Sequence, residues 1–445
     1  YCGFCQRFGC EANAKGSAHI TVIPIAMASP NFELRANSWV TQVLKDPAGK
    51  KVTGVRYTNL MNGEEYEQPA GIVLLTAYAI NNVHLMLLSG IGEPYDPVSQ
   101  KGVIGKNYCY QTGVGANLFF DDHNFNPFMS AGGSNHTIDD FNANWDFDRG
   151  PHGFVGGFTI GAGFNTSLPI GNRPVPSGTP AWGTAWKAAQ AKSYQTAMNI
   201  GSSGSVMANR YNYFDLDPTY KNAFGQPLMR MTFDYKDNEH RMGRHAAEKI
   251  NALAKTMNPT HLNEASARTE PWTVVPYQST HNTGGTIMGS SPGNSALNKY
   301  LQSWDCHNLF VVGANVFPHN ASYNPTGPVG ALAYWTAEAI KRYSKNPAPL
   351  VSAFGSRNMI PLRVGEAVLF VQRAGLKLRD MVYDSMSEKF TSSDQTVFAD
   401  HITQGGIVQM VYQQEPYSVC WGLRQDGLLV AMTYSREQYQ NPPFG

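Results

Sequence analysis

Short apolar runs that end in small residues mark two predicted strands. Leu309-Phe310-Val311-Val312 is followed by Gly313, and Gly71 to Ala77 forms a second run of this kind. Short apolar runs with such boundaries are typical of buried strands, and a terminal glycine lets a ligand approach the backbone closely. We therefore predict two buried strands, with a ligand-binding edge at the carboxyl end of the 309–312 strand.

A helical pattern follows each of these runs. Ala331 to Tyr343 carries good helix formers behind Pro328, which a first helical turn tolerates. Asn81 to Ser89 forms the second pattern and ends at the C-cap residue Gly90. Strands alternating with helices predict an α/β fold. The helix N-terminus near Pro328 would favour negative charge at the ligand edge, as on a flavin ring that becomes anionic when reduced.

Further runs predict strands outside this centre. Alternating or β-branched residues occur at 19–24, 32–35, 38–44, 51–57 and 228–233. A short helix-like stretch occurs at 25–28, and a long helical pattern occurs at 238–257. After Tyr343, residues 344–350 form a helix exit and linker, and the rest of the chain is strand-like. Two hairpins are predicted there, 367–373 with 376–383 and 417–423 with 428–434, the second joined by Asp426-Gly427.

Composition narrows the possible partners. A chain of 445 residues with 42% hydrophobic content can bury a large core that splits into two or more domains. Lys and Arg number 34 against 33 acidic residues, so the net charge of +1 gives no reason to expect nucleic acid or an anionic membrane surface as partner. No apolar run is long enough to span a bilayer, and no signal peptide is present. Because the first residue is Tyr1, we expect the true N-terminus to lie upstream.

Two side chains are candidates for chemistry at the ligand edge. His281 lies in a Gly-rich turn, and Asn324 precedes the helix that contains Pro328. A neutral imidazole can accept the proton of a substrate hydroxyl near neutral pH. We expect both residues to address such a hydroxyl, with His319 and His307 as competing candidates. The alternative is a Gly-rich loop next to an ordinary buried helix.

Taken together, this stretch resembles the C-terminal signature of the glucose-methanol-choline (GMC) family of flavin-dependent oxidoreductases. Within the family it is most similar to the large subunits of membrane-associated gluconate, fructose and sorbitol type dehydrogenases. The matching residues are His281, Gly284, Gly285, the Asn308–Phe317 segment and Asn324-Pro325-Thr326. The resemblance implies a partial FAD-binding Rossmann-like domain (1–111 and 276–350), a mixed-sheet substrate domain (112–275) and, outside the family, a C-terminal all-β segment (351–445).

The resemblance also implies an activity. A CH–OH group of a sugar, sugar acid or polyol is oxidised, with His281 as base, Asn324 on the same oxygen, and N5 of FAD accepting the hydride. Tyr78 lies where the family more usually has glycine. Polar and aromatic residues of the substrate region, any of which could instead be structural, are candidates for sugar binding: Asn142, Asn144, Trp145, Trp182 and Tyr213. The implied FAD-binding positions are Val40, Gly313, Ala314, Asn315, Asn324, Pro325 and Thr326.

One family motif is missing from this sequence. Gly-x-Gly-x-x-Gly after a strand allows a pyrophosphate to lie on the backbone at a helix N-terminus, and the chain does not contain it. Family members carry this motif near their N-terminus. We therefore expect the first part of the FAD domain to lie upstream, and the chain by itself to bind FAD poorly.

Three cysteines lie close together at the start. Cys2, Cys5 and Cys10 are spaced Cys-x2-Cys-x4-Cys, and soft thiolates this close can hold an iron–sulfur cluster or zinc. Three thiolates suit a three-iron cluster, a four-iron cluster or zinc would need a fourth ligand, and a disulfide with one free thiol is the alternative. The resemblance implies a 3Fe-4S cluster that passes electrons to a cytochrome c subunit. It also implies a small accessory subunit and a periplasmic location, in which the cytochrome c subunit attaches the enzyme to the inner membrane.

The C-terminal segment has a different resemblance. Residues 364–384 and 407–437 resemble tail tube or nozzle proteins of short-tailed bacteriophages, which are structural and not enzymatic. Two interpretations stay open: two unrelated genes joined near residue 351, or an accessory β domain. Sequencing of the source DNA across codons 340 to 360 distinguishes them.

Overall fold

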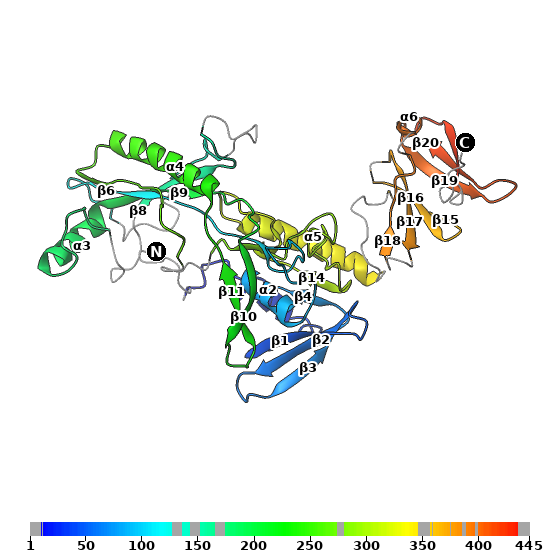
Figure 1. Ribbon diagram of the computed structural model, residues 1–445, viewed down its shortest axis with the longest axis horizontal. Coiled ribbons are helices and arrows are strands. Elements are labelled where there is room, and N and C mark those ends of the chain that lie inside the picture. The colour runs from blue at the N-terminus through cyan, green and yellow to red at the C-terminus, as the bar shows by residue number, and fades with distance from the viewer. Residues whose placement is uncertain are drawn as a thin grey trace. The chain divides into compact units, whose positions relative to one another are not determined.

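A computed structural model of the chain is shown in Figure 1. It forms two compact units, Tyr1–Pro347 and Ala348–Gly445, which are described separately. Within the part of the chain that is described, no helix is long and apolar enough to cross a lipid bilayer. The described residues are 10, 12–126, 136–142, 152–164, 174–273, 280–345, 357, 359–373, 375–384, 389–396 and 399–434.

The centre of unit 1 is a pair of parallel strands. β4 (Val73–Leu75) pairs with β14 (Leu309–Val311), and both strands are short and apolar. β4 leads into α2 (Ala79–Leu88), and β14 leads through the 3-10 turn η2 (Ala314–Val316) into α5 (Thr326–Lys345). The predicted α/β arrangement of two strands, each followed by a helix, is therefore confirmed.

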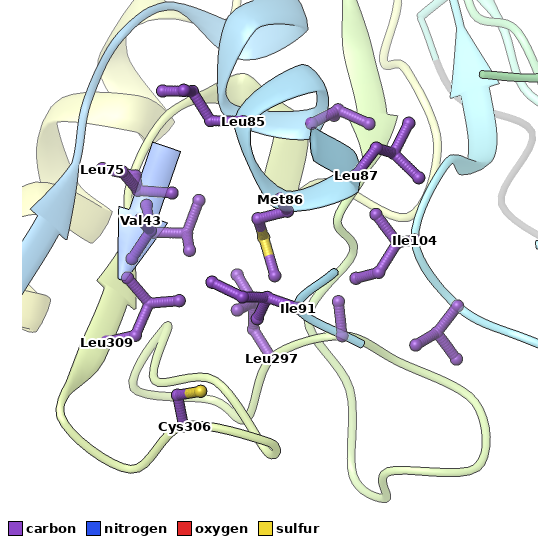
Figure 2. Packing of buried hydrophobic residues seen from close by; sticks show 14 of the residues in the cluster. Val43, Leu75, Leu85, Met86, Leu87, Ile91, Ile104, Leu297, Cys306 and Leu309 are labelled. Atoms are coloured by element: carbon purple, nitrogen blue, oxygen red, sulfur yellow. The ribbon is translucent and has the colours of Figure 1, made fainter. Parts of the chain in front are cut away.

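Apolar side chains from several segments hold this centre together. In Figure 2, Met86 points from α2 toward Ile91, with Leu75 on one side and Ile104 on the other. Full burial of an aliphatic side chain stabilises the fold by about 1.5–3 kcal/mol, whereas a hydrogen bond contributes about 1 kcal/mol net. Packing in this cluster, more than the few ladder bonds of a two-stranded sheet, therefore fixes β4 and β14 in place.

An antiparallel sheet flanks the centre. It consists of β1 (Ser38–Lys45), β2 (Val52–Asn59) and β3 (Glu65–Pro69), and its first two strands were predicted from their alternating residues. The buried Asn308 connects this sheet to the parallel strands. Its Nδ2 donates to the carbonyls of Val52 and Gly71, at 2.8 Å each, and its Oδ1 accepts from the Val52 N–H at 2.8 Å.

The N-terminal strand predictions are wrong. The strand predicted at 19–24 is absent, because the helix α1 (Val22–Met27) begins within it, whereas the helix-like stretch predicted from residue 25 is confirmed; residues 32–35 form no strand. Pro24 cannot donate to a sheet ladder, but the first turn of a helix tolerates it, and Ile25-Ala26-Met27 continue that turn. None of the residues of α1 is buried.

The region between residues 112 and 275 is built on a five-stranded sheet. Its order is β12-β6-β9-β8-β7, and every described strand pair in it is antiparallel, whereas a mixed sheet was expected. Parallel strands would need crossover connections, whereas each neighbouring pair of strands described here runs in opposite directions. The strands are β6 (Gly115–Phe119), β7 (His136–Ile138), β8 (Phe158–Phe164), β9 (Ala197–Gly204) and β12 (His261–Asn263).

Two helices belong to this region. α4 (Asp237–Thr256) matches the prediction, and its buried Met242, Ala246 and Ile250 pack against the sheet. α3 (Thr184–Thr196) was not predicted. It buries only Ser193 and Tyr194, so its sequence lacks the apolar stripe by which a surface helix is recognised.

Two further strand pairs connect the parts of unit 1. β10 (Tyr213–Lys221) and β11 (Pro227–Thr232) form a hairpin, of which only β11 was predicted, at 228–233. β13 (Thr283–Gly285), which directly follows His281, pairs with β5 (Lys106–Cys109).

Unit 2 has its own core and two antiparallel sheets. The first is β15-β16-β17-β18 and the second is β19-β20-β21, and both predicted hairpins are present as β16–β17 and β20–β21. The elements are β15 (Leu362–Val364), β16 (Ala367–Val371), β17 (Leu378–Asp384), β18 (Lys389–Thr391), α6 (Asp400–Thr403), β19 (Ile407–Gln413), β20 (Val419–Arg424) and β21 (Leu429–Thr433).

Candidate active site

His281 and Asn324 meet in the structure although 43 positions separate them. His281 precedes β13, Asn324 precedes α5, and the distance from His281 Nε2 to Asn324 Oδ1 is 2.6 Å. The imidazole is half-buried and the amide is exposed. Two polar side chains that face each other at a helix N-terminus can both reach one small polar group placed between them.

The backbone of His281 adopts an uncommon conformation that the neighbouring loop holds. Its φ angle is +62°, in the left-handed region that non-glycine residues rarely enter. The buried Asn320 donates from Nδ2 to the His281 carbonyl at 2.5 Å and to Thr283 Oγ1 at 3.3 Å. Asn320 also forms two backbone hydrogen bonds with Val206. The loop that carries Asn324 is therefore attached to the loop that carries His281.

Gln111 fixes the same loop from another side. Its Nε2 donates to the carbonyls of Ala321 and Tyr323, at 2.9 and 2.7 Å, immediately before Asn324. The Tyr235 hydroxyl donates to the Gln111 carbonyl at 2.8 Å. Burial raises the pKa of Tyr235, so the hydroxyl keeps its proton and remains a donor.

Asn282, next to His281, is held at both ends of its amide. Tyr108 donates its hydroxyl proton to Asn282 Oδ1, and Asn282 Nδ2 donates to the Tyr78 hydroxyl oxygen, both at 2.6 Å. Asn282 and Tyr108 are buried. Sequence reasoning did not identify Asn282, Asn320 or Gln111, because single amide residues in loops give no local signal of their partners.

The competing histidines differ in surroundings. His307 Nδ1 lies 2.7 Å from the Tyr343 hydroxyl beneath α5, and burial lowers the pKa of this imidazole. His319 is exposed. Of the three, the structure brings only His281 to within hydrogen-bond distance of Asn324 in the described part of the chain.

The expected FAD-binding positions lie in two places. Val40, on the edge strand β1, lines a cavity of about 200 Å³, where the neighbouring ring of Trp39 stacks on Phe224. A cavity with an aromatic wall, amide side chains and the backbone of an edge strand fits a flat ring with polar edges, such as adenine. Its other lining residues are Ser38, Ala77, Asn81, His84, Leu85, Leu88, Asn222 and Gln226.

The second place is the turn between β14 and α5. Gly313 has φ +149°, and a Cβ atom there would lie 2.6 Å from Asn315 Oδ1, so the turn requires glycine. Asn315 is fully buried: its Nδ2 donates to Thr286 Oγ1 at 2.6 Å, and its Oδ1 accepts from Asn82 at 3.0 Å. The Asn315 side chain therefore shapes the turn, and Ala314 beside it offers its backbone. Pro325 directly precedes α5, which begins at Thr326.

Asn82 was also missed by sequence reasoning. It is fully buried on α2, its Oδ1 accepts from the Ala77 N–H at 2.8 Å, and its Nδ2 donates to the Val312 carbonyl at 3.1 Å. One amide thus ties together the turns that follow β4 and β14. These are the two turns where a parallel sheet binds a ligand.

The cysteine cluster lies mostly outside the described residues. Cys2 and Cys5 fall outside them, and Cys10 is described as a half-buried free thiol. Backbone N–H groups of Ala14 and Lys15 lower the pKa of Cys10, which favours the thiolate that metals bind. Among the described residues, no group of three or more His, Cys, Asp or Glu side chains is placed to hold a metal ion.

Thiol chemistry offers a direct check of these environments. Of the four described cysteines, we expect iodoacetamide to modify Cys10 of the metal-free chain first at mildly alkaline pH, because only thiolates react. Burial raises the pKa of Cys109 to about 12 and that of Cys306 and Cys420 to about 11. Cys109 should therefore react on the order of 10³-fold more slowly than Cys10. Mass spectrometry of labelled peptides measures the order, and early labelling of Cys109 in folded protein would contradict it.

Sequence comparisons place the chain among known enzymes. Residues 1–121 and 208–333 match the N- and C-terminal models of GMC oxidoreductases, together more than half of the chain. The gluconate 2-dehydrogenase flavoprotein of Pantoea cypripedii is 45% identical over 79% of this chain and 58% of its own length. The 2-methyl-1,2-propanediol dehydrogenase of Mycolicibacterium austroafricanum is 24% identical over 70% of this chain and 54% of its own.

A third relative is matched over a shorter stretch. The fructose dehydrogenase large subunit of Gluconobacter japonicus is 28% identical over 32% of this chain and 25% of its own length. The chain thus spans little more than half the length of the first two of these relatives. Because the two family models together match more than half of the chain, the chain belongs to the GMC oxidoreductase family.

Proposed function

We propose that the protein is the catalytic flavoprotein part of a dehydrogenase that oxidises a CH–OH group of a sugar acid, sugar or polyol. The observation that carries the proposal is the 2.6 Å contact between His281 and Asn324 at the N-terminus of α5. The names of the relatives, two of which are gluconate and fructose dehydrogenases, support the substrate class.

His281 and Asn324 have different roles at the substrate oxygen. Hydride leaves a carbinol carbon readily only when negative charge grows on its oxygen, so the hydroxyl proton must be removed. His281 accepts that proton as a neutral imidazole, and the Asn324 amide donates a hydrogen bond to the same oxygen. A substrate hydroxyl must then replace the contact that the two side chains make with each other. Asn324 Oδ1 can only accept a hydrogen bond, so Nε2 carries the proton in the contact seen here; when the substrate binds, Nε2 must be unprotonated and the amide must turn its Nδ2 toward the substrate oxygen.

The described residues fit FAD at its two ends. The cavity at Val40 would hold the adenine, and the turn at Gly313 and Ala314, with Pro325 and Thr326 at the start of α5, would face the flavin ring. Bound FAD would supply the hydride acceptor at N5. The helix N-terminus adds a positive potential that favours a reduced, anionic ring.

The remaining parts of the proposal rest on family resemblance and on the relatives. The fructose dehydrogenase relative is named as a large subunit, which supports partner subunits for this chain. From the family resemblance, we further propose that the enzyme has a cytochrome c subunit and a small accessory subunit, and that it is located in the periplasm at the inner membrane. A 3Fe-4S cluster at Cys2, Cys5 and Cys10 would be the electron outlet, and the lowered pKa of Cys10 supports a thiolate ligand there. Low-temperature EPR and iron analysis of the oxidised protein test the cluster.

A dye-linked assay tests the activity itself. The chain is assayed together with the proposed partner subunits and a segment that carries the dinucleotide-binding motif, supplied with FAD, using an artificial electron acceptor and gluconate, fructose, sorbitol and glucose in parallel. Reduction of the dye with at least one substrate, and its loss in His281→Ala, is the expected result. Failure of all four substrates to reduce the flavin would refute the proposed function.

FAD affinity provides a separate prediction. The sequence contains no Gly-x-Gly-x-x-Gly turn to hold the pyrophosphate. We therefore expect the 445-residue chain alone to bind FAD weakly, and a form extended by a segment that carries the motif to bind it tightly. Equilibrium dialysis with absorbance detection measures both forms. A stoichiometric yellow preparation of the chain alone would contradict this.

A further inference from the structure

Tyr78 has a backbone conformation that only glycine adopts easily. Its φ and ψ angles are +82° and 148°, and it is the N-cap of α2. A side chain in this region is strained, and such strain persists only where the surrounding structure over-determines it. A glycine at this position would remove the strain without changing the path of the chain. A property of the tyrosine side chain must therefore account for its use here.

The backbone around Tyr78 is fixed from both sides by one residue. Asn82 Oδ1 accepts from the Ala77 N–H at 2.8 Å, and the Asn82 N–H donates to the Tyr78 carbonyl at 2.9 Å. These bonds define where the phenol is directed, but they do not require a phenol. They would form equally well with glycine between them.

The phenol makes a contact that glycine could not make. Asn282 Nδ2 donates to the Tyr78 hydroxyl oxygen at 2.6 Å, while Tyr108 donates to Asn282 Oδ1 at the same distance. The Tyr78 side chain is about half exposed, with a residue exposure of 43%, so burial of its ring is a small contribution. The hydrogen bond of its hydroxyl to Asn282, a residue that is 4% exposed, is the larger contribution to stability.

The amide of Asn282 is thereby oriented at both ends, and the peptide that joins it to His281 is oriented with it. His281 has its own left-handed φ of +62°, and its carbonyl is held by Asn320. We infer that Tyr78 is a positioning residue: through Asn282 it fixes the direction in which the His281 imidazole faces Asn324. The expected effect of Tyr78 on catalysis rests on the proposed function, whereas its effect on the orientation of the His281 imidazole does not.

Two substitutions separate the hydrogen bond from the strain. Tyr78→Phe keeps the ring and the strained backbone and removes only the hydroxyl oxygen. Tyr78→Gly removes the strain as well. Tyr220→Phe, on β10 with 68% exposure, is the matched control for loss of a tyrosine hydroxyl.

The first measurement needs no FAD and no substrate. Histidine-labelled samples of the 445-residue chain are compared by NMR, with the His281 imidazole signals assigned from their loss in His281→Ala. We expect both Tyr78 variants to shift or broaden these signals and Tyr220→Phe to leave them in place. We also expect Tyr78→Gly to melt at a higher temperature than Tyr78→Phe, because it no longer carries the strained φ angle.

The second measurement uses the FAD-loaded enzyme. We expect kcat to fall on the order of 10- to 100-fold in both variants, with KM changed much less, because a misdirected base slows the reaction more than it weakens binding. Unchanged His281 signals in Tyr78→Phe would overturn the inference, as would a lower melting temperature for Tyr78→Gly than for Tyr78→Phe. If the parent enzyme oxidises none of the four substrates, the proposed function fails while the NMR result still decides the role of Tyr78.

Discussion

Replacing His281 by alanine is expected to lower the rate constant for substrate oxidation by about 10²–10⁴-fold, the usual contribution of a positioned general base. The imidazole is the group in the described structure that both reaches Asn324 and can accept a proton near neutral pH. Its removal leaves the hydroxyl proton without an acceptor, so the expected loss is in kcat, with a small change in KM. Anaerobic stopped-flow measurement of flavin reduction by substrate reports this rate constant directly.

The control for this substitution is His319→Ala. His319 is exposed and lies on the same loop as Asn324, so its removal changes the loop composition without removing the proposed base. We expect its flavin reduction rate to remain close to that of the parent. Normal turnover in His281→Ala, or an equal loss of the flavin reduction rate in His319→Ala, would show that His281 is not the base.

Replacing Gly284 by alanine is expected to destabilise unit 1 by about 4 kcal/mol, from an unfavourable φ angle and a steric clash together. Gly284 has φ +82° on β13, and an added Cβ would lie 1.8 Å from the Asn107 carbonyl oxygen on the facing strand. The two strands must separate to admit the methyl group. Urea denaturation followed by circular dichroism measures the free energy of unfolding.

Gly178 provides a matched control for the clash. It has nearly the same φ, +87°, and no atom within 4 Å of an added Cβ. Gly178→Ala should therefore cost only about 1–2 kcal/mol, the φ contribution alone. Equal destabilisation by the two alanines would show that β5 and β13 are not packed as closely as the structure indicates.

The central fold was predictable because its signals are local. The apolar run ending at Gly313 and the helix formers after Pro328 are each contained in one stretch, and they became β14 and α5. The same holds for β1, β2, α4 and the C-terminal hairpins. Residues 19–24 show the limit: a run of strand type forms no strand and instead leads into the first half of α1, since Pro24 cannot join a ladder and the described part of the chain offers the run no partner strand.

The site was predictable only in part. His281 and Asn324 were identified by resemblance, and the structure brings their side chains together. The residues that hold them, Asn320, Gln111 and Asn282, act across distances of up to about two hundred positions along the chain. No periodicity records such pairs. The strain at Tyr78 is likewise invisible in the sequence, because a φ angle depends on the tertiary contacts of the turn.

A double-mutant cycle on His281 and Asn324 tests the central claim most directly. The rate constant of flavin reduction is measured in the parent, in His281→Ala, in Asn324→Ala and in the double variant. Because both side chains act on one substrate oxygen, we predict strong coupling, with the double variant about as slow as the slower single variant. Rate losses that multiply independently would show that the two residues do not act on the same oxygen, and would contradict the account.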